Sequence, residues 1–168
     1  MVHNISKKQH NSKMCFVCGL KNRAGLQASF YETDDGALVA IFTPGKEHQG
    51  YPGRMHGGIA STILDETIGR AVMIGSDKDV WGVTLELKVE YNKPVPLGVE
   101  LRAVARITEE SARFFSGRGE ILLPDGGVAV TASGRYMKVP IEKIAEFEES
   151  EFGWAVVPGE DDPAYIDF

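Results

Sequence analysis

Long apolar runs and basic stretches are missing from this sequence, and each absence excludes a class of protein. No run of about 18 apolar residues occurs, the length that a membrane-spanning helix needs, so we expect no membrane partner. Residues 1–13, MVHNISKKQHNSK, contain no apolar segment of the kind found in a secretory signal. These absences predict a cytoplasmic protein.

The charge is unevenly distributed along the chain. The net charge is −6, and residues 142–168 contain nine acidic residues and one basic residue. That segment is therefore −8, which leaves about +2 for residues 1–141. A nearly neutral body offers no basic stripe for a duplex, so we expect no nucleic-acid partner. It still leaves room for local contacts between Lys or Arg and a phosphate.

Cysteine is scarce. Only Cys15 and Cys18 occur, in the sequence Cys-Phe-Val-Cys-Gly. A structural zinc site usually has four ligands, and no second cysteine pair follows. A thioredoxin-like redox pair follows a strand in a βαβ unit, which this pattern lacks. We therefore expect no metal in the functional site and favour structural use of the pair, with a metal site or a redox pair as alternatives.

Six segments have the pattern of strands, and one has the period of a long helix. Asp35-Gly36 marks a turn between the first two strands, and a loop rich in proline and glycine follows. We also expect a tight turn at Glu109-Glu110. The predicted strands are 27–32, 37–43, 83–91, 99–108, 112–122 and 128–138, the loop is 44–55, and the predicted helices are 57–74 and 141–149.

The long helix has one apolar face, so one sheet must cover it. Its apolar positions fall within an arc of about 140°: Ala60, Ile63, Leu64, Thr67, Ile68, Ala71 and Ile74. Hairpin-length connections make the last four strands antiparallel. We predict an α+β fold of hotdog type, one antiparallel sheet wrapped around a central helix. The domain is expected at 14–140, between a flexible N-terminus at 1–13 and an acidic C-terminal extension at 141–168, whose aromatic residues allow part of it to dock.

The start of the long helix, His56-Gly57-Gly58, is a candidate site for a carbonyl oxygen. The first turn of a helix has backbone N–H groups without partners, and the helix dipole adds partial positive charge. Glycines allow a ligand to approach this backbone, so the Gly57 N–H could polarise a thioester carbonyl. The alternative interpretation is a tight turn between loop and helix.

Two carboxylates follow in the same helix. Glu66 stands four residues before Arg70, in the favourable order for an ion pair on a helix surface. Asp65 lies at the edge of the apolar arc without such a partner, and a half-buried carboxylate needs partners and has the character of a base. His56 and Asp65 are more than about 10 Å apart by helical rise, so we expect them to act together only from different subunits.

The segment from His56 to Asp65 resembles the phenylacetate-degradation (PaaI-like) branch of the hotdog-fold thioesterases. The run 89–98, Val-Glu-Tyr-Asn-Lys-Pro-Val-Pro-Leu-Gly, resembles the strand and turn that follow in that branch. The early Cys-Phe-Val-Cys-Gly, with Gly25-Leu26, is similar to the opening of one of its subgroups. The resemblance covers roughly residues 14–138.

The resemblance implies a role for each matching residue. Gly57 N–H polarises the thioester carbonyl, His56 shapes the surroundings of its oxygen, and Asp65 from the facing subunit activates water or attacks directly. Thr84 matches a Ser or Thr that positions the water, although strand parity places it on the solvated face. The family usually has an Asn or Gln in the loop before the His. Relatives with Asn place it six residues ahead, where this chain has Gly50, so we expect the neighbouring Gln49 to take that role.

The resemblance also implies the substrate and the assembly. The substrate is a small to medium or aromatic acyl-CoA, no cofactor is needed, and CoA enters only as part of the substrate. The site lies between subunits of a homodimer, and dimers are expected to pair. Predicted contacts to the substrate are Gly58, Ser61 and Gly69 on the helix, and Lys93, Arg113 and Arg135 for the CoA phosphates.

Two other functions fit parts of the pattern. A hotdog protein that binds acyl-CoA, or another small acyl ligand, without catalysis is consistent with the departure at Gly50. A dehydratase or hydratase is less well supported, because His56 is the only well-placed histidine and no His-Phe-Pro-Gly loop is present.

Overall fold

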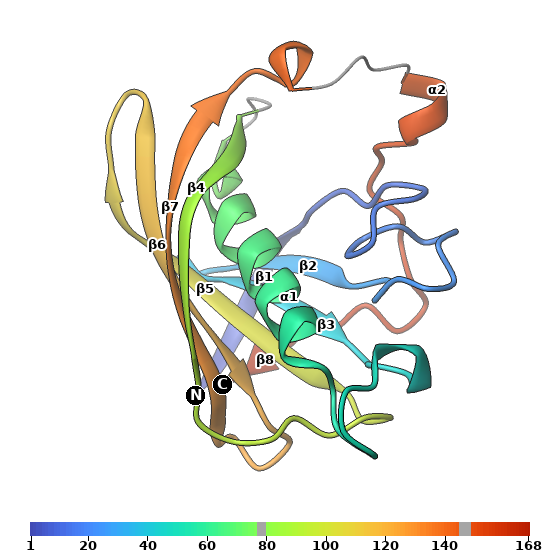
Figure 1. The fold of residues 1–168 in the computed structure, drawn as a ribbon. Coiled ribbons are helices and arrows are strands. Elements are labelled where there is room, and N and C mark those ends of the chain that lie inside the picture. Colours follow the sequence, from blue (N-terminus) through green and yellow to red (C-terminus); the bar gives the residue numbers. More distant parts are fainter. Residues whose placement is uncertain (77–79, 145–148) are drawn as a thin grey trace.

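The computed structural model describes residues 1–76, 80–144 and 149–168. One eight-stranded antiparallel sheet, in the order β4-β7-β6-β5-β3-β2-β1-β8, curls around the helix α1 (Figure 1). The strands are β1 Val2–Lys8, β2 Ser29–Thr33, β3 Leu38–Phe42, β4 Trp81–Tyr91, β5 Leu101–Glu110, β6 Phe114–Leu122, β7 Val128–Val139 and β8 Tyr165–Asp167. No helix among these described residues is long and apolar enough to cross a membrane.

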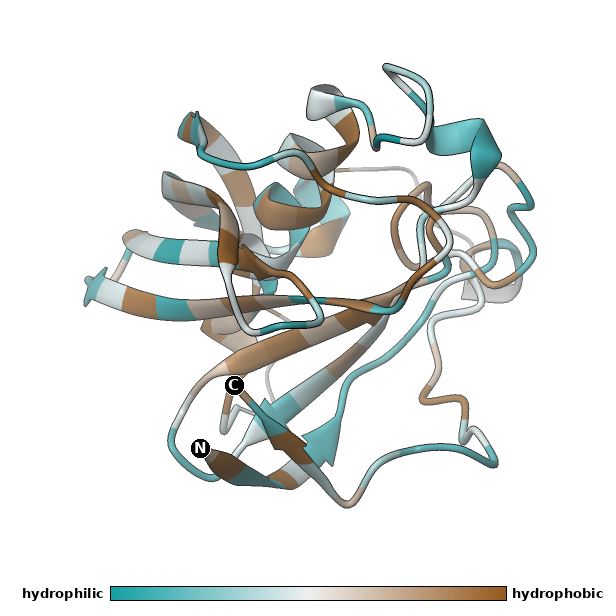
Figure 2. Ribbon diagram, turned by 90° about the horizontal axis from the view of Figure 1, so that it is seen from below, coloured by the Kyte–Doolittle hydropathy of each residue, from teal (hydrophilic) through white to brown (hydrophobic). Residues whose placement is uncertain are grey.

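The helix α1 spans Gly57–Arg70, and the 3-10 turn η2 at Ala71–Met73 continues it. The α-helix is thus shorter than the predicted 57–74, and Gly75 follows with a φ of 66°, which suits a helix end. The predicted apolar face is buried: Ala60, Ile63, Leu64, Thr67, Ile68 and Ala71. Figure 2 shows the alternation of apolar and polar residues along the strands that brings one face of the sheet against this helix.

Two glycines of β6 let the helix lie close to the sheet. A Cβ atom at Gly117 would be 2.7 Å from Ile68 Cγ2, and one at Gly119 would be 3.2 Å from Leu64 Cδ2. The side chains of α1 therefore fill the space above β6 that strand side chains would otherwise occupy. This close packing holds α1 in place over the middle of the sheet.

The predicted flexible N-terminus is wrong for residues 2–8, because they form a strand inside the sheet. β1 pairs with β2 on one side and with β8 on the other, so the two ends of the chain lie side by side (Figure 1). Ile5 packs with the buried Ile166 of β8, and Lys8 forms an ion pair with Asp162 at 2.5 Å. These long-range partners, rather than local propensity, order the segment.

The predicted turn at Glu109-Glu110 is also wrong, since both residues lie in β5. A bulge between Ile107 and Glu109 extends that strand, and Ser111 makes the turn by donating its backbone N–H to the Phe114 carbonyl at 2.8 Å. Other short elements are the 3-10 turns η1 Lys46–His48 and η3 Ile141–Lys143 and the helix α2 Glu149–Phe152. Part of the helix predicted at 141–149 falls on 145–148, outside the described residues.

Part of the acidic C-terminal extension docks, as its aromatic residues suggested. Trp154 stacks on His10 with ring centroids 5.3 Å apart and lies 4.7 Å from Trp81. This contact joins the C-terminal extension to the N-terminal loop and to the start of β4.

Candidate active site

Asp65 lies in the middle of α1 and accepts two side-chain hydrogen bonds. Thr84 Oγ1 of β4 donates to Asp65 Oδ1 at 2.9 Å, and Tyr136 OH of β7 donates to the same oxygen at 3.1 Å. Tyr136 is fully buried, and burial together with the negative charge of Asp65 raises the pKa of its phenol well above the usual range. Tyr136 is therefore a constant hydrogen-bond donor that fixes one carboxylate oxygen.

A β-bulge brings Thr84 to Asp65. The register with β7 shifts between Thr84 and Glu86, so Leu85 is an extra residue in the strand. Thr84 therefore faces α1 despite its position in the alternation, and Leu85 is 46% exposed instead of buried. The parity argument against Thr84 fails for this reason, because it assumed an alternation without a bulge.

The start of α1 has the arrangement expected of a helix cap with a free amide. His56 is the N-cap residue, and its Nδ1 accepts the Gly58 N–H at 2.9 Å. Within the part of the chain that the structure describes, the Gly57 N–H has no acceptor. Tyr91 OH lies 3.0 Å from the Gly57 carbonyl oxygen and 2.6 Å from Ser61 Oγ, so β4 supports this turn from below.

The loop before His56 folds back on itself. Gln49 is exposed, and its Oε1 accepts the Gly53 N–H at 3.0 Å, which closes the turn 49–53. A Cβ atom at Gly50 would lie 3.0 Å from His56 Cα, so an asparagine could not replace Gly50 without moving this loop. The catalytic role of Gln49 stays a prediction.

The predicted substrate contacts do not form one cluster within this chain. Gly69 is buried, and a Cβ there would meet the ring of Tyr136 at 3.4 Å, so Gly69 has a packing role. Lys93 follows the C-terminal end of β4 beside Gly127. Arg113 and Arg135 lie at the opposite end of the sheet, with guanidinium carbons 5.6 and 5.9 Å from the Phe114 ring. Contact of any of them with a substrate stays a prediction.

The contacts of two tyrosines in the site, Tyr136 and Tyr91, were not predicted from the sequence. Tyr136 is separated from Ala132 and Gly134 by even steps along β7, which places it on the inward face, where a phenol needs a hydrogen-bond partner. That signal was available. Tyr91 ends the alternating run of β4, and nothing in its sequence indicated the contact with Gly57.

The predicted surface pair Glu66–Arg70 forms, but it is not at the surface. Arg70 Nε lies 2.8 Å from Glu66 Oε1, and Arg70 is only 3% exposed. Its guanidinium carbon lies 4.2 Å from the Phe30 ring and 4.8 Å from the Trp154 ring. The prediction failed because the C-terminal extension and the N-terminal loop cover this face of α1.

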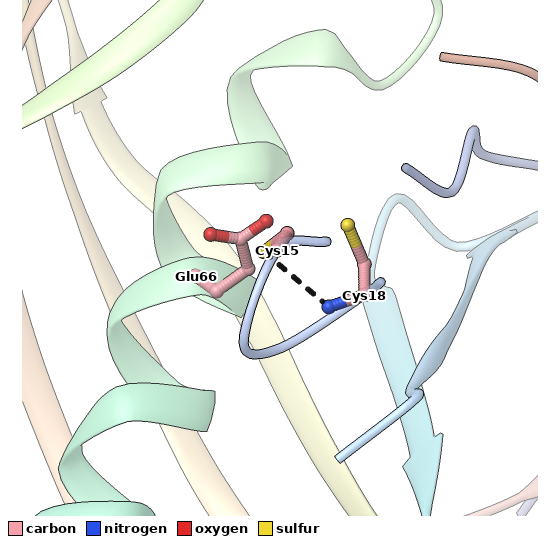
Figure 3. A group of neighbouring side chains, drawn as sticks. All are labelled: Cys15, Cys18 and Glu66. Carbon is pink, nitrogen blue, oxygen red and sulfur yellow. Dashed lines mark hydrogen bonds between the residues drawn. The ribbon is translucent and has the colours of Figure 1, made fainter. Parts of the chain in front are cut away.

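Cys15 and Cys18 are free thiols beside Glu66, and they lie on the covered face of α1 (Figure 3). The hydrogen bond from the Cys15 thiol, followed by the charge of Arg70, lowers the pKa of the Cys18 thiol against the opposing effect of burial. The same bond and burial raise the pKa of Cys15. Cys18 is therefore the more acidic thiol of the two.

Two hollows of the single chain lie away from Asp65. One of about 550 Å³ is lined by Lys88, Arg106, Arg118 and neighbouring residues on the outer face of the sheet, opposite α1. Asp65 lies instead at the side of α1 next to β4, and among the residues described its Oδ2 has no hydrogen-bond donor. Among the described residues no strand pairs with the outer edge of β4, so this region is open to a second molecule.

Comparison with known proteins shows which family model and which relatives this chain resembles. Residues 52–130 match the family model described as thioesterase superfamily. The chain is similar to the acyl-coenzyme A thioesterase THEM4 of Rattus norvegicus, with 34% identity over 92 residues that make up 54% of this chain and 38% of that protein. THEM4 of Xenopus laevis is 39% identical over 70 residues, 41% of this chain and 30% of that protein. The chain thus spans well under half of the length of these curated relatives.

Solved structures with a similar fold include two that are relevant to this site. A Bacillus halodurans protein crystallised with CoA has a TM-score of 0.61 and 27% identity, covering 68% of this chain and 76% of that one. The PaaI protein of the E. coli phenylacetic acid degradation operon has a TM-score of 0.61 and 16% identity, covering 68% and 81%, which shows the fold alone. These likenesses confirm the predicted hotdog fold, and residues 52–130, which hold α1 and Asp65, match the thioesterase superfamily model.

Proposed function

We propose that this chain is an acyl-CoA thioesterase in which Asp65 is the catalytic carboxylate. The observation that carries the proposal is the fixed carboxylate: Thr84 and Tyr136 hold Asp65 Oδ1 and leave Oδ2 for water or a carbonyl carbon. The amide of Gly57 at the start of the same helix supplies the matching donor for an oxyanion. The similarity to THEM4 and the family match over this helix support the same activity.

We propose further that the complete site forms between two copies of the chain. In the part of the chain that the structure describes, β4 Trp81–Tyr91 is an edge strand, and such an edge readily pairs with another strand. Within one chain, Thr84 contacts Asp65 and Tyr91 contacts Gly57. Antiparallel pairing of β4 with β4 of a second copy, with Thr84 opposite Tyr91, sets Asp65 of one copy beside Gly57 of the other.

The reaction follows from these two groups. The thioester carbonyl accepts the Gly57 N–H, and Asp65 either takes a proton from the attacking water or attacks the carbonyl itself. When water attacks, collapse of the tetrahedral intermediate breaks the carbon–sulfur bond, and the departing CoA thiolate takes up the proton that Asp65 accepted. When Asp65 attacks, the same bond breaks and leaves a mixed anhydride between Asp65 and the acyl group. Water then hydrolyses this anhydride to the free acid and Asp65, and the proton released goes to the CoA thiolate. Water and acyl-CoA thus give the free acid and CoA. Small to medium and aromatic acyl groups are the proposed substrates.

Turnover of an acyl-CoA panel tests the proposal. The loss of thioester absorbance is followed for wild type, Asp65→Asn and the exposed control Glu109→Gln. We expect Asp65→Asn to lower kcat by about 10²–10⁴-fold and the control to match wild type. Equal turnover of Asp65→Asn and wild type would refute the role of Asp65.

The alternative is a protein that binds acyl-CoA without hydrolysing it, and the departure at Gly50 favours it. Calorimetry with CoA and with a non-hydrolysable acyl-CoA analogue distinguishes the two. Binding without turnover on any member of the panel would establish the alternative.

A further inference from the structure

A second cluster of side chains, which can bind a metal ion, lies on the face of α1 next to that of Asp65. It consists of Cys15, Cys18 and Glu66. Their ligand atoms all lie within 4.8 Å of one another, and Figure 3 shows the Cys15–Cys18 turn lying against the carboxylate on α1. Cys18 is buried, whereas Cys15 is only partly covered. The cluster is therefore enclosed by protein and still open to a small ion.

The backbone of the turn is arranged around sulfur. The N–H groups of Val17 and Cys18 point at Cys15 Sγ, at 3.3 and 3.4 Å, and Ser12 Oγ lies 3.4 Å from Cys18 Sγ. Donors aimed at sulfur stabilise the negative charge of a thiolate, the form in which cysteine binds a metal. A Cβ at Gly19 would be 2.3 Å from the Cys15 carbonyl oxygen, so the turn requires glycine there.

A buried asparagine fixes this turn to the rest of the fold. Asn11 is 1% exposed, and its Nδ2 donates to the carbonyls of Cys18 and Ala28 at 2.9 Å each. The two sulfur atoms are thus held in place by backbone contacts that do not involve the thiols themselves. Such preorganisation is what a binding site needs and what an incidental pair of cysteines lacks.

Glu66 supplies the third donor. Its Oε1 accepts Arg70 Nε at 2.8 Å, and Oε2 is not used in that pair. The pair holds the carboxylate in the way that outer-shell partners hold metal ligands. With both thiols protonated, the charges of Glu66 and Arg70 cancel. With two thiolates and one divalent cation they cancel again, so the ion replaces two protons without leaving a buried net charge.

We propose that Cys15, Cys18 and Glu66 bind one zinc ion, with water or the Ser12 hydroxyl in the fourth position. Two thiolates and a carboxylate in a small tetrahedral space suit zinc better than magnesium or calcium, which prefer oxygen ligands. The ion joins the N-terminal loop to α1 one residue from Asp65. Binding releases two thiol protons and changes no oxidation state. The site is structural, and it stands whether or not the chain hydrolyses acyl-CoA.

Cobalt titration of the full, reduced chain tests the site. Co²⁺ bound by thiolates gives an intense charge-transfer absorption in the near ultraviolet, which octahedral oxygen sites lack. We expect this band to saturate at one ion per chain and to disappear when Zn²⁺ displaces the cobalt. Metal analysis of protein purified without chelators gives the zinc content directly.

Variants separate ligands from bystanders. Cys15→Ser, Cys18→Ser and Glu66→Gln should each weaken zinc binding, the two serine variants by more than the roughly 10–100-fold that loss of a supporting outer-shell contact causes. Ser12→Ala tests the fourth position, because a loss within this range indicates water there and a larger loss indicates the Ser12 hydroxyl. His3→Asn is the matched control, because His3 belongs to the one other group of potential ligands found in the described residues, with Asp34 and Asp35.

Three results would overturn the proposal, and the first two come from the titrations. One is a reduced wild-type chain that takes up Co²⁺ without a charge-transfer band. The other is unchanged zinc affinity in both serine variants. If a variant fails to fold by circular dichroism, the wild-type titration and Glu66→Gln decide. A Cys15–Cys18 disulfide recovered from zinc-replete medium, with no metal in the protein, would also reject the site in favour of a redox pair.

Discussion

Removing the Tyr136 hydroxyl should slow catalysis without unfolding the protein. Tyr136→Phe deletes the 3.1 Å hydrogen bond to Asp65 Oδ1 and leaves Thr84, among the described residues, as the only side-chain donor to that oxygen. A hydrogen bond to a charged group contributes about 1.5–3 kcal/mol. If this energy positions Asp65 in the transition state, kcat falls by roughly 10- to 150-fold.

The effect on stability should be smaller, for two structural reasons. The Tyr136 ring stacks on Phe115 with centroids 5.0 Å apart, and phenylalanine keeps this contact. The lost hydroxyl no longer needs a partner in a fully buried position, which offsets part of the lost bond. We expect the free energy of unfolding to fall by only about 1 kcal/mol, a typical net value for a hydrogen bond.

Steady-state hydrolysis of a good acyl-CoA substrate and urea unfolding measure the two effects. Tyr165→Phe, in an exposed part of β8, removes a hydroxyl far from α1 and should match wild type in both assays. An unchanged kcat for Tyr136→Phe would refute the positioning role. A fall in unfolding free energy by several kcal/mol would show that the hydroxyl mainly supports the fold.

Three further predictions follow from other contacts. Gly117→Ala places a Cβ 2.7 Å from Ile68 Cγ2, so urea unfolding should show a loss of about 1–3 kcal/mol. Leu85→Lys puts a charge at the edge of β4. Sedimentation should then show monomers, and hydrolysis assays should show little turnover. Intact dimers would exclude the proposed β4 pairing. At Asp162, partial burial raises the pKa, but hydrogen bonds from Gly159 N–H, Lys8 and Tyr31 outweigh it and lower the pKa below 3.8. Its stabilisation is therefore present at neutral pH and lost as pH falls through the folded-state pKa, so the Tm difference between wild type and Asp162→Asn should vanish in acid.

The elements that fold around one buried face were predictable from the sequence. The alternation in β4 to β7 and the apolar arc of α1 each report directly which side chains leave water, and these elements appear within a few residues of their predicted bounds. From the residues alone, Asp65 stood out because a helix interior is a poor place for an unpartnered carboxylate. The resemblance singled out Thr84 as a residue that positions water, whereas alternation placed it on the solvated face, and its contact with Asp65 was not predicted.

The parts that were missed depend on partners distant in the sequence. β1, with the sequence Val-His-Asn-Ile-Ser-Lys-Lys, buries little, and its strand forms because β2 and β8 flank it. The burial of Arg70 depends on Trp154, and the wheel of α1 contains no sign of that cover. The bulge at Leu85 shifts the side-chain alternation of β4, and the composition of the strand does not indicate it. In each case the deciding contact is absent from the segment itself.

The adjacency of β1 and β8 has a consequence for the order of folding. Met1 donates its terminal N–H to the Phe168 carbonyl at 2.7 Å, across 167 positions of the chain. Closing so large a loop carries an entropic cost that short hairpins such as β6–β7 avoid, so this ladder should assemble after the hairpins have formed. During synthesis, the edge of β1 that pairs with β8 stays unmatched until Tyr165–Asp167 have emerged. The edge of β1 that pairs with β8 is therefore exposed to wrong partners for longer than the edge that pairs with β2.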